Sequence, residues 1–187
     1  MKSNSDPSFS EELADLPPWD QAFWLSRAFI EGSLYLCENM LDGGFSSQYS
    51  SSRVVLHLAR QGIELFLKAA IGAATAPKSA PATHDLQLLF LEYQRQYPSL
   101  DLAFKIPPIF LVNSDLPLFP EEQYAFHRTL DQRHRYPTDR TGNSFMTRET
   151  FDPKETVAEL TNLDRELKIL ETAYIRRIVA GQKPITW

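Results

Sequence analysis

The sequence predicts an all-α fold, an up-and-down bundle of four to five helices, and three observations favour it. Apolar residues recur at intervals of three and four over most of the chain, which is the spacing of one helix face. No stretch of useful length alternates apolar and polar residues as a half-buried strand does. The 187 residues include only seven glycines, and the 13 prolines gather between the helical patterns. Long helices joined by stiff connectors are therefore expected.

Two helices are expected in the N-terminal half of the chain. A broad apolar face predicts the first over 19–41, and the glycine pair that follows should end it. The serine-rich segment 46–52 is expected to be a loop. Apolar residues at helical spacing then predict the second helix over 54–70, before the chain enters a linker of alanine and proline.

A third, shorter helix is expected after this linker. Thr83 or Asp85 should cap it, because short polar side chains satisfy the unpaired N–H groups of a first helical turn. It should stop before Pro98. The segment 98–120 contains five prolines, so we expect a connector that packs on the surface of the core.

Two more helices are expected on either side of a loop. The fourth should cover 121–135, because Pro137 disfavours a helical conformation in the residue before it. A loop should follow over 138–151. Asp152 then has the features of a helix cap, with Pro153 at the first helical position, and an apolar stripe predicts the last helix beyond it.

These patterns predict one domain. Residues 19–181 should form a single helical bundle, preceded by a flexible segment, 1–18, and followed by a tail, 182–187. The first residues have no apolar signal region, and no run is long enough to cross a membrane, so we expect a cytoplasmic protein without membrane contact. The single cysteine, Cys37, excludes an intramolecular disulfide and is expected to be a buried, inert thiol.

Arginine clusters around the end of the fourth predicted helix. Between His127 and Arg148 there are five arginines against two aspartates, on a chain whose formal net charge is −5. That net charge argues against indiscriminate nucleic-acid binding. A local cluster of arginines nevertheless suits a phosphate site, because a guanidinium group binds phosphate as a fork. A solvated charged loop is the alternative explanation of the same residues.

The second and third predicted helices carry a resemblance to a known family. Glu64 and Leu67-Lys68-Ala69, followed after a loop by His84-Asp85-Leu86, are similar in order and spacing to the core of the HEPN superfamily. This family of helical bundles occurs in prokaryotic toxin and defence systems and beside nucleotidyltransferases. The resemblance extends over roughly 19–178, nearly the whole predicted bundle, and implies a HEPN-like fold.

Active HEPN members carry an arginine, four to six intervening residues and then a histidine. Arg128 and His134, separated by five residues, fit this motif, and Tyr136 fits a tyrosine that many members place two residues after the histidine. The resemblance implies a metal-independent endoribonuclease without a cofactor, acting on RNA as a homodimer in a toxin–antitoxin or defence system. The wide apolar faces of the first two helices also favour a dimer. A nucleotidyltransferase antitoxin is an implied partner, with Tyr136 as the residue that it modifies.

The side chains suit that reaction. RNA cleavage of this type needs a base that takes the 2′-hydroxyl proton, for which His134 is suited, and a cation that stabilises the crowded phosphorane, for which Arg128 is suited. Arg133, Arg135 and Tyr136 would position RNA phosphate. Six positions on an ideal helix leave two residues about 120° and about 9 Å apart, so a fraying helix end or a dimer cleft must bring the pair together. We expect both residues at a polar helix end, where truncation costs little stability.

Two alternatives stay open. His127, Asp131 and His134 share one helix face and could ligate zinc or another divalent ion, but the outer pair lies about 10 Å apart on a straight helix. We prefer no metal site there, with Asp131 orienting the histidines. The second alternative is a non-catalytic helical module that binds a nucleotide, phosphate or partner protein through the arginine-rich helix end. It is favoured because Arg135-Tyr136-Pro137 resembles the ending of a HEPN branch whose members bind ligands or partners.

Overall fold

Helices make up most of the part of the chain that the structure describes. This computed structural model describes residues 13–76, 80–110, 129, 132–145 and 151–185. Within those ranges, β-type pairing is limited to one isolated bridge between Thr138 and Ser144. The predicted all-α class is therefore confirmed for these residues.

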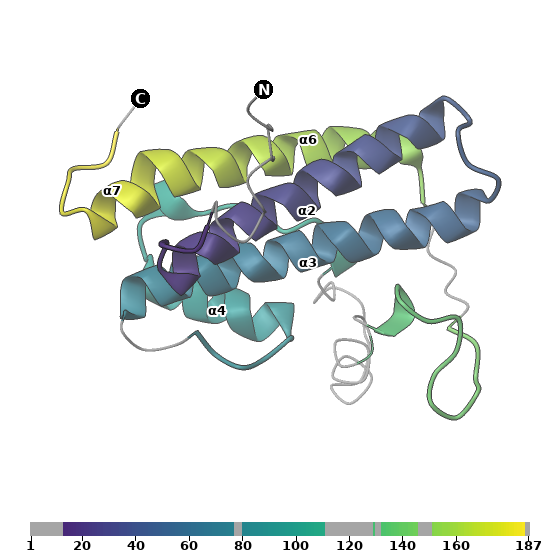
Figure 1. Ribbon diagram of the computed structural model, residues 1–187, viewed down its shortest axis with the longest axis horizontal. Coiled ribbons are helices and arrows are strands. Elements are labelled where there is room, and N and C mark those ends of the chain that lie inside the picture. Colours follow the sequence, from purple (N-terminus) through teal and green to yellow (C-terminus); the bar gives the residue numbers. More distant parts are fainter. Residues whose placement is uncertain (1–12, 77–79, 111–128, 130–131, 146–150, 186–187) are drawn as a thin grey trace, which may run out of the picture.

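Two long helices form the centre of the bundle (Figure 1). α2 spans Pro18–Leu41 and α3 spans Gln48–Thr75, and they run antiparallel as a hairpin. They approach closely because Gly62 has no side chain: a Cβ at this position would lie 2.6 Å from Cδ1 of Ile30. The hydroxyl of Ser26 also donates to the carbonyl oxygen of Gly62 at 2.7 Å. Close packing and a buried hydrogen bond together hold the hairpin.

The serine-rich segment before α3 is not the loop that the sequence predicts. The helix begins at Gln48, and Ser47 caps it by accepting a hydrogen bond from the backbone N–H of Ser50 at 3.2 Å. A serine side chain at this position satisfies an N–H that the first turn leaves without a helical partner. Residues 48–52 therefore belong to α3, and their side chains have fixed directions.

The next helix, α4, follows the prediction closely, whereas the connector after it does not. α4 spans Leu86–Gln96, and Asp85 caps it by accepting from the N–H groups of two residues in its first turn. Two short 3-10 turns, Leu100–Leu102 and Pro108–Phe110, follow. The connector was expected on the surface of the core, but its apolar side chains are buried in it: Leu102, Phe104, Ile106 and Phe110.

The C-terminal helical segment is continuous but changes its geometry. α6 spans Pro153–Ile169, a π-helical stretch covers Leu170–Ile175, and α7 spans Arg176–Val179. Asp152 caps α6 through its carboxylate, as the sequence predicts. The π-helical stretch is not visible in the apolar spacing, because one inserted residue shifts the stripe by only part of a turn.

The helices stack so that the central hairpin is covered on two sides. α6 packs against α2, and α4 packs against α3 (Figure 1). Phe66 of α3 lies in the middle of this core, with ring-centroid distances of 5.4 Å to Phe23 and 5.5 Å to Phe104. Edge-to-face contacts of this kind add to the apolar burial of each ring.

Most of the fourth predicted helix, 121–135, lies outside the described residues. Thr129, Gln132 and Arg133 are helical, and a turn follows at residues 134 and 135. The helix thus ends before Pro137, as predicted.

The two ends of the chain are described in part. Of the predicted flexible segment 1–18, residues 1–12 lie outside the described residues. Of the predicted tail 182–187, residues 186–187 also lie outside, but the backbone N–H of Ile185 donates to the carbonyl of Ala173 at 3.2 Å. The described part of the tail therefore contacts the bundle. Among the described helices, none combines the length and apolar character that a membrane crossing requires.

Candidate functional site

His134 lies in a cavity at the N-terminal end of α3. The cavity has a volume of about 420 Å³, within the range of small-molecule sites. The first turns of α3, the turn that contains His134 and the beginning of α6 form its walls. The lining residues are Gln48, Tyr49, Ser52, Arg53, Leu56, His134, Phe151 and Pro153.

The burial of His134 differs from the sequence-based expectation. It was expected at a polar helix end, but only 6% of its surface is exposed. Ser52, another lining residue, is 7% exposed. Burying a polar group costs free energy unless the group is hydrogen-bonded. Because two buried polar residues, His134 and Ser52, line one cavity, this place differs from an ordinary, solvent-exposed charged helix end. The low cost expected for truncating His134 no longer holds.

Arg53 supplies a cation to this cavity, and sequence reasoning missed it. Its Nη1 donates to the hydroxyl of Tyr49 at 3.0 Å, and its Nη2 donates to the backbone carbonyl of Tyr136. The guanidinium carbon lies 5.5 Å from the centroid of the Tyr49 ring, within reach of a cation–π contact. Arg53 therefore connects α3 to the segment just after His134. The available signal was its position four residues after Tyr49, which places the two side chains one helical turn apart.

The three predicted phosphate-binding residues, Arg133, Arg135 and Tyr136, are not among the residues that line the cavity. Nε of Arg133 donates to Oγ1 of Thr129 at 3.0 Å. The guanidinium of Arg135 lies 5.6 Å from the ring centroid of Tyr136, whose residue is 51% exposed. Their link to the cavity is the backbone carbonyl of Tyr136, which accepts a hydrogen bond from the lining residue Arg53.

The remaining members of the predicted motifs fall outside the described residues. These are Arg128, the predicted catalytic cation, and His127 and Asp131, which would complete the alternative metal set. The distance from Arg128 to His134 is therefore still a prediction from helix geometry. Among the residues that the structure does describe, no group of three or more His, Cys, Asp or Glu side chains could hold a metal ion.

Three polar residues that carry the HEPN resemblance, Glu64, Lys68 and His84, form a cluster with Arg60 farther along α3. Glu64 is 1% exposed and accepts from Arg60 at 3.2 Å and from Lys68 at 2.8 Å, while Nδ1 of His84 lies 2.9 Å away. Arg60 also donates to the backbone carbonyl of His84. Burial raises the pKa of Glu64, but the hydrogen bond and charge of Lys68 and the charges of Arg60 and His84 outweigh it, so the pKa is lower than usual. This cluster joins α3 to the loop before α4.

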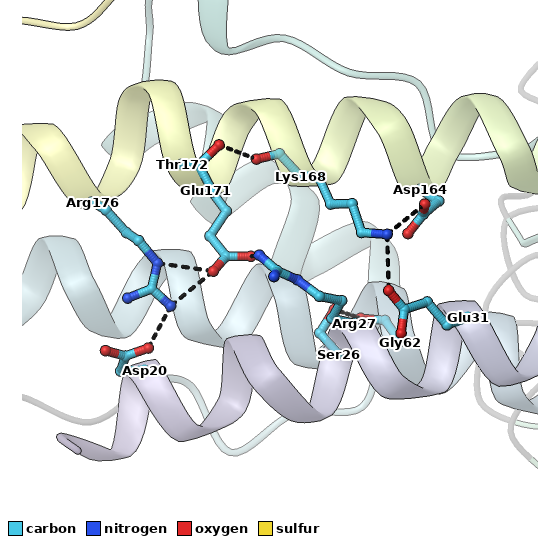
Figure 2. A network of polar contacts seen from close by, with 10 residues as sticks. All are labelled: Asp20, Ser26, Arg27, Glu31, Gly62, Asp164, Lys168, Glu171, Thr172 and Arg176. Carbon is cyan, nitrogen blue, oxygen red and sulfur yellow. Dashed lines mark hydrogen bonds and ion pairs between the residues drawn. The ribbon is translucent and has the colours of Figure 1, made fainter. Parts of the chain in front are cut away.

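A second polar network joins α2 to the C-terminal helical segment (Figure 2). The carboxylate of Glu171, within the π-helical stretch, accepts from Arg27 at 2.9 Å and from Nε of Arg176 at 2.8 Å. Arg176 also pairs with Asp20 of α2. Glu171 is 4% exposed. Because its charge is compensated by two arginines, this network is explained as a fastening between helices.

The surroundings of Cys37 disfavour a reactive thiolate. Burial, with smaller contributions from two nearby acids, raises the pKa of its thiol to about 11, so the nucleophilic thiolate is scarce at neutral pH. The sulfur lies 3.4 Å from the carbonyl oxygen of Pro153. The prediction of a buried, inert thiol is confirmed for its burial.

Comparisons of the chain with protein-family models, with curated proteins and with solved structures found no match. The HEPN resemblance therefore stays a prediction from the sequence.

Proposed function

We propose that this protein is a metal-independent endoribonuclease whose reaction takes place at the cavity of His134. The observation that carries this proposal is the position of His134: a titratable side chain lines a cavity beside the cation of Arg53 and the hydroxyl groups of Tyr49 and Ser52. Histidine is the side chain best suited to move a proton near neutral pH, and arginine is the best fork for phosphate.

In the proposed reaction, His134 takes the proton from a ribose 2′-hydroxyl. The 2′-oxygen then attacks the adjacent phosphorus, and the bond from phosphorus to the 5′-oxygen breaks. The departing 5′-oxygen takes a proton from water, and His134 afterwards gives its proton back to the solvent, so the products are a 2′,3′-cyclic phosphate and a 5′-hydroxyl. Arg128 is the proposed cation that stabilises the phosphorane, because the HEPN resemblance assigns this role to the arginine of the motif.

The outer arginines have a supporting role in this proposal. Arg133 and Arg135, with Tyr136, position the RNA backbone next to the cavity. Arg135 and Tyr136 are exposed, as groups that meet a polynucleotide must be. The HEPN-like scaffold, the toxin–antitoxin or defence context and modification of Tyr136 by a nucleotidyltransferase partner belong to the same proposal.

A homodimer is also proposed. Large apolar side chains of the central hairpin are exposed in the single chain, including Trp24, Leu25, Tyr35 and Val54 at 43–66%. Exposed apolar groups on soluble proteins often mark contact surfaces. Light scattering at micromolar concentration tests this point, and a monomer would contradict it.

A specific observation favours the second candidate function, a non-catalytic module for a nucleotide or phosphate. His134 is largely buried, and both terminal nitrogens of Arg53 already donate hydrogen bonds. The walls of the cavity are therefore held in place before a ligand arrives, which suits binding and requires no reactive side chain.

The two functions are distinguished by the RNA products. Wild-type protein is incubated with labelled RNA in excess chelator, and the new ends are identified by mass spectrometry. We expect 2′,3′-cyclic phosphate ends, and we expect Arg128→Ala to slow their formation strongly. Arg95→Ala is the matched control, because Arg95 is exposed and pairs with Glu92 of its own helix, α4. Binding of RNA without any cleavage would contradict the enzyme and support the module. Activity that chelator abolishes and zinc restores would support the metal set of His127, Asp131 and His134.

A further inference from the structure

The geometry points to a nucleobase site in the same cavity: we propose that one unpaired base of an RNA strand enters it and stacks on Tyr49. This inference rests on the proposed function only in taking RNA as the ligand. It assigns a recognition role to residues of α3 that lie outside the predicted motif, and it concerns binding, not the reaction.

Tyr49 has the properties of a stacking platform. It stands at the wall of the cavity and is 55% exposed. The contacts of Arg53 with both the hydroxyl and the ring of Tyr49 hold the side chain in one orientation. Aromatic rings fixed in this way bind unpaired bases by stacking, with little preference for base identity.

The inner walls of the cavity suit a base in shape and polarity. Leu56, Phe151 and Pro153 supply apolar surface. The hydroxyl of Ser52 donates to the backbone carbonyl of Tyr49 at 2.7 Å, so its oxygen can still accept a hydrogen bond from a base edge. Gln48, also in the wall, carries an amide that both donates and accepts.

Arg53 places this base beside the reaction proposed for His134. Its guanidinium contacts both the stacking ring and the carbonyl of Tyr136, two residues after His134. A phosphate attached to the stacked nucleotide would thus have a cation at the edge of the cavity. Bases within a duplex are paired and stacked on each other, so the site selects single strands.

The test measures binding of uncleavable RNA to the full-length protein. Fluorescence anisotropy is recorded with three 2′-O-methyl probes: a single strand, the same strand without bases, and a duplex. Wild type should bind the single strand about 10-fold more tightly than either other probe, which is the size of one stacking contact. Tyr49→Leu should lose about 10-fold for the single strand and nothing for the base-free strand, whereas Tyr49→Phe should keep most of the affinity.

The control is Leu91→Ala, since Leu91 of α4 is 52% exposed and is not among the lining residues. It should bind all probes as wild type does. Equal affinity of wild type for the strands with and without bases would overturn the inference, and so would an unchanged Tyr49→Leu. Base-dependent binding through Tyr49 without cleavage of ordinary RNA would leave the inference standing and refute the endoribonuclease. If Tyr49→Leu cleaves RNA as wild type does, the endoribonuclease stands and the stacking of a base on Tyr49 is refuted.

Discussion

Two parts of α3 use polar side chains in different ways. From the middle of the helix onward, Arg60, Glu64 and Lys68 form a cluster in which opposite charges meet directly. Near the N-terminal end, Ser52 and Arg53 line a cavity together with His134 of a distant segment. In the first arrangement the charges are satisfied by one another, whereas the second lines a cavity of about 420 Å³. Polar burial alone therefore does not identify a site: a site also needs space next to the polar groups.

The largest expected effect is the loss of stability when the cluster of Arg60, Glu64 and Lys68 is broken. Glu64→Ala should lower the free energy of unfolding by about 3–5 kcal/mol, because it leaves the charge of Arg60 buried without its partner. Arg60 is 2% exposed, so water cannot replace the carboxylate without local opening. Urea denaturation measures the loss. A change below about 1 kcal/mol would mean that the cluster is not a structural fastening.

The same cluster should respond to pH in a definite direction. The pKa of Glu64 in the folded protein lies below its usual 4.5, so as the pH falls the unfolded chain binds this proton first. The stabilisation by Glu64 is therefore present above about pH 4.5 and is lost as the pH falls through the folded pKa. The difference in unfolding free energy between wild type and Glu64→Gln should shrink from pH 7 to pH 3. A difference that grows would contradict the assigned direction.

A matched pair of arginines sharpens the comparison. Arg60→Ala should destabilise the fold by several kcal/mol, because it removes a fully buried side chain that pairs with Glu64 and donates to the carbonyl of His84. Arg53→Ala should cost about 1 kcal/mol, the net value of ordinary hydrogen bonds near solvent, but it should weaken RNA binding about 10-fold through a lost phosphate contact. Thermal unfolding and anisotropy are measured on both variants. Similar losses of stability in Arg53→Ala and Arg60→Ala would contradict the difference between the two parts of α3.

The smallest expected effect concerns the outer surface. Arg135→Ala should weaken binding of single-stranded RNA by a few-fold for every sequence and lower the slope of affinity against salt by about 1, because it removes one phosphate contact. The stability should not change, since Arg135 is exposed. A sequence-dependent loss would show that Arg135 contacts a base.

Local rules predicted much of the fold. The bounds of α2, the Asp85 cap of α4 and the Asp152 cap of α6 follow from short-range chemistry that a single sequence contains. Two local features were missed. The early start of α3 was missed because several neighbouring serines could each cap the helix, and the sequence does not show that Ser47 does so. The π-helical stretch at 170–175, which places Glu171 next to Arg27 of α2, was also missed.

The candidate site was predictable only in part. His134 stands out by its residue type within an arginine-rich segment. Its burial and the cavity depend on the packing of α3 against segments far away in the sequence, which periodicity does not reveal. Arg53 and Tyr49 are separated from His134 by about 80 positions in the chain, and only the fold brings Arg53 into contact with Tyr136.

Whether RNA is cleaved at the cavity of His134 is best tested by the single-turnover rate of RNA cleavage by His134→Gln. Glutamine keeps a polar side chain in the buried position but cannot accept and release a proton near neutral pH, so the rate should fall by about 10²–10⁴-fold. Circular dichroism and the melting temperature confirm that the variant is folded. His84→Gln is the control, because His84 has a side chain that is 70% exposed and lies at the cluster of Glu64. We expect a large loss of the cleavage rate for His134→Gln and near-normal cleavage for His84→Gln. If folded His134→Gln cleaves RNA at the wild-type rate, the reaction does not depend on this cavity's histidine.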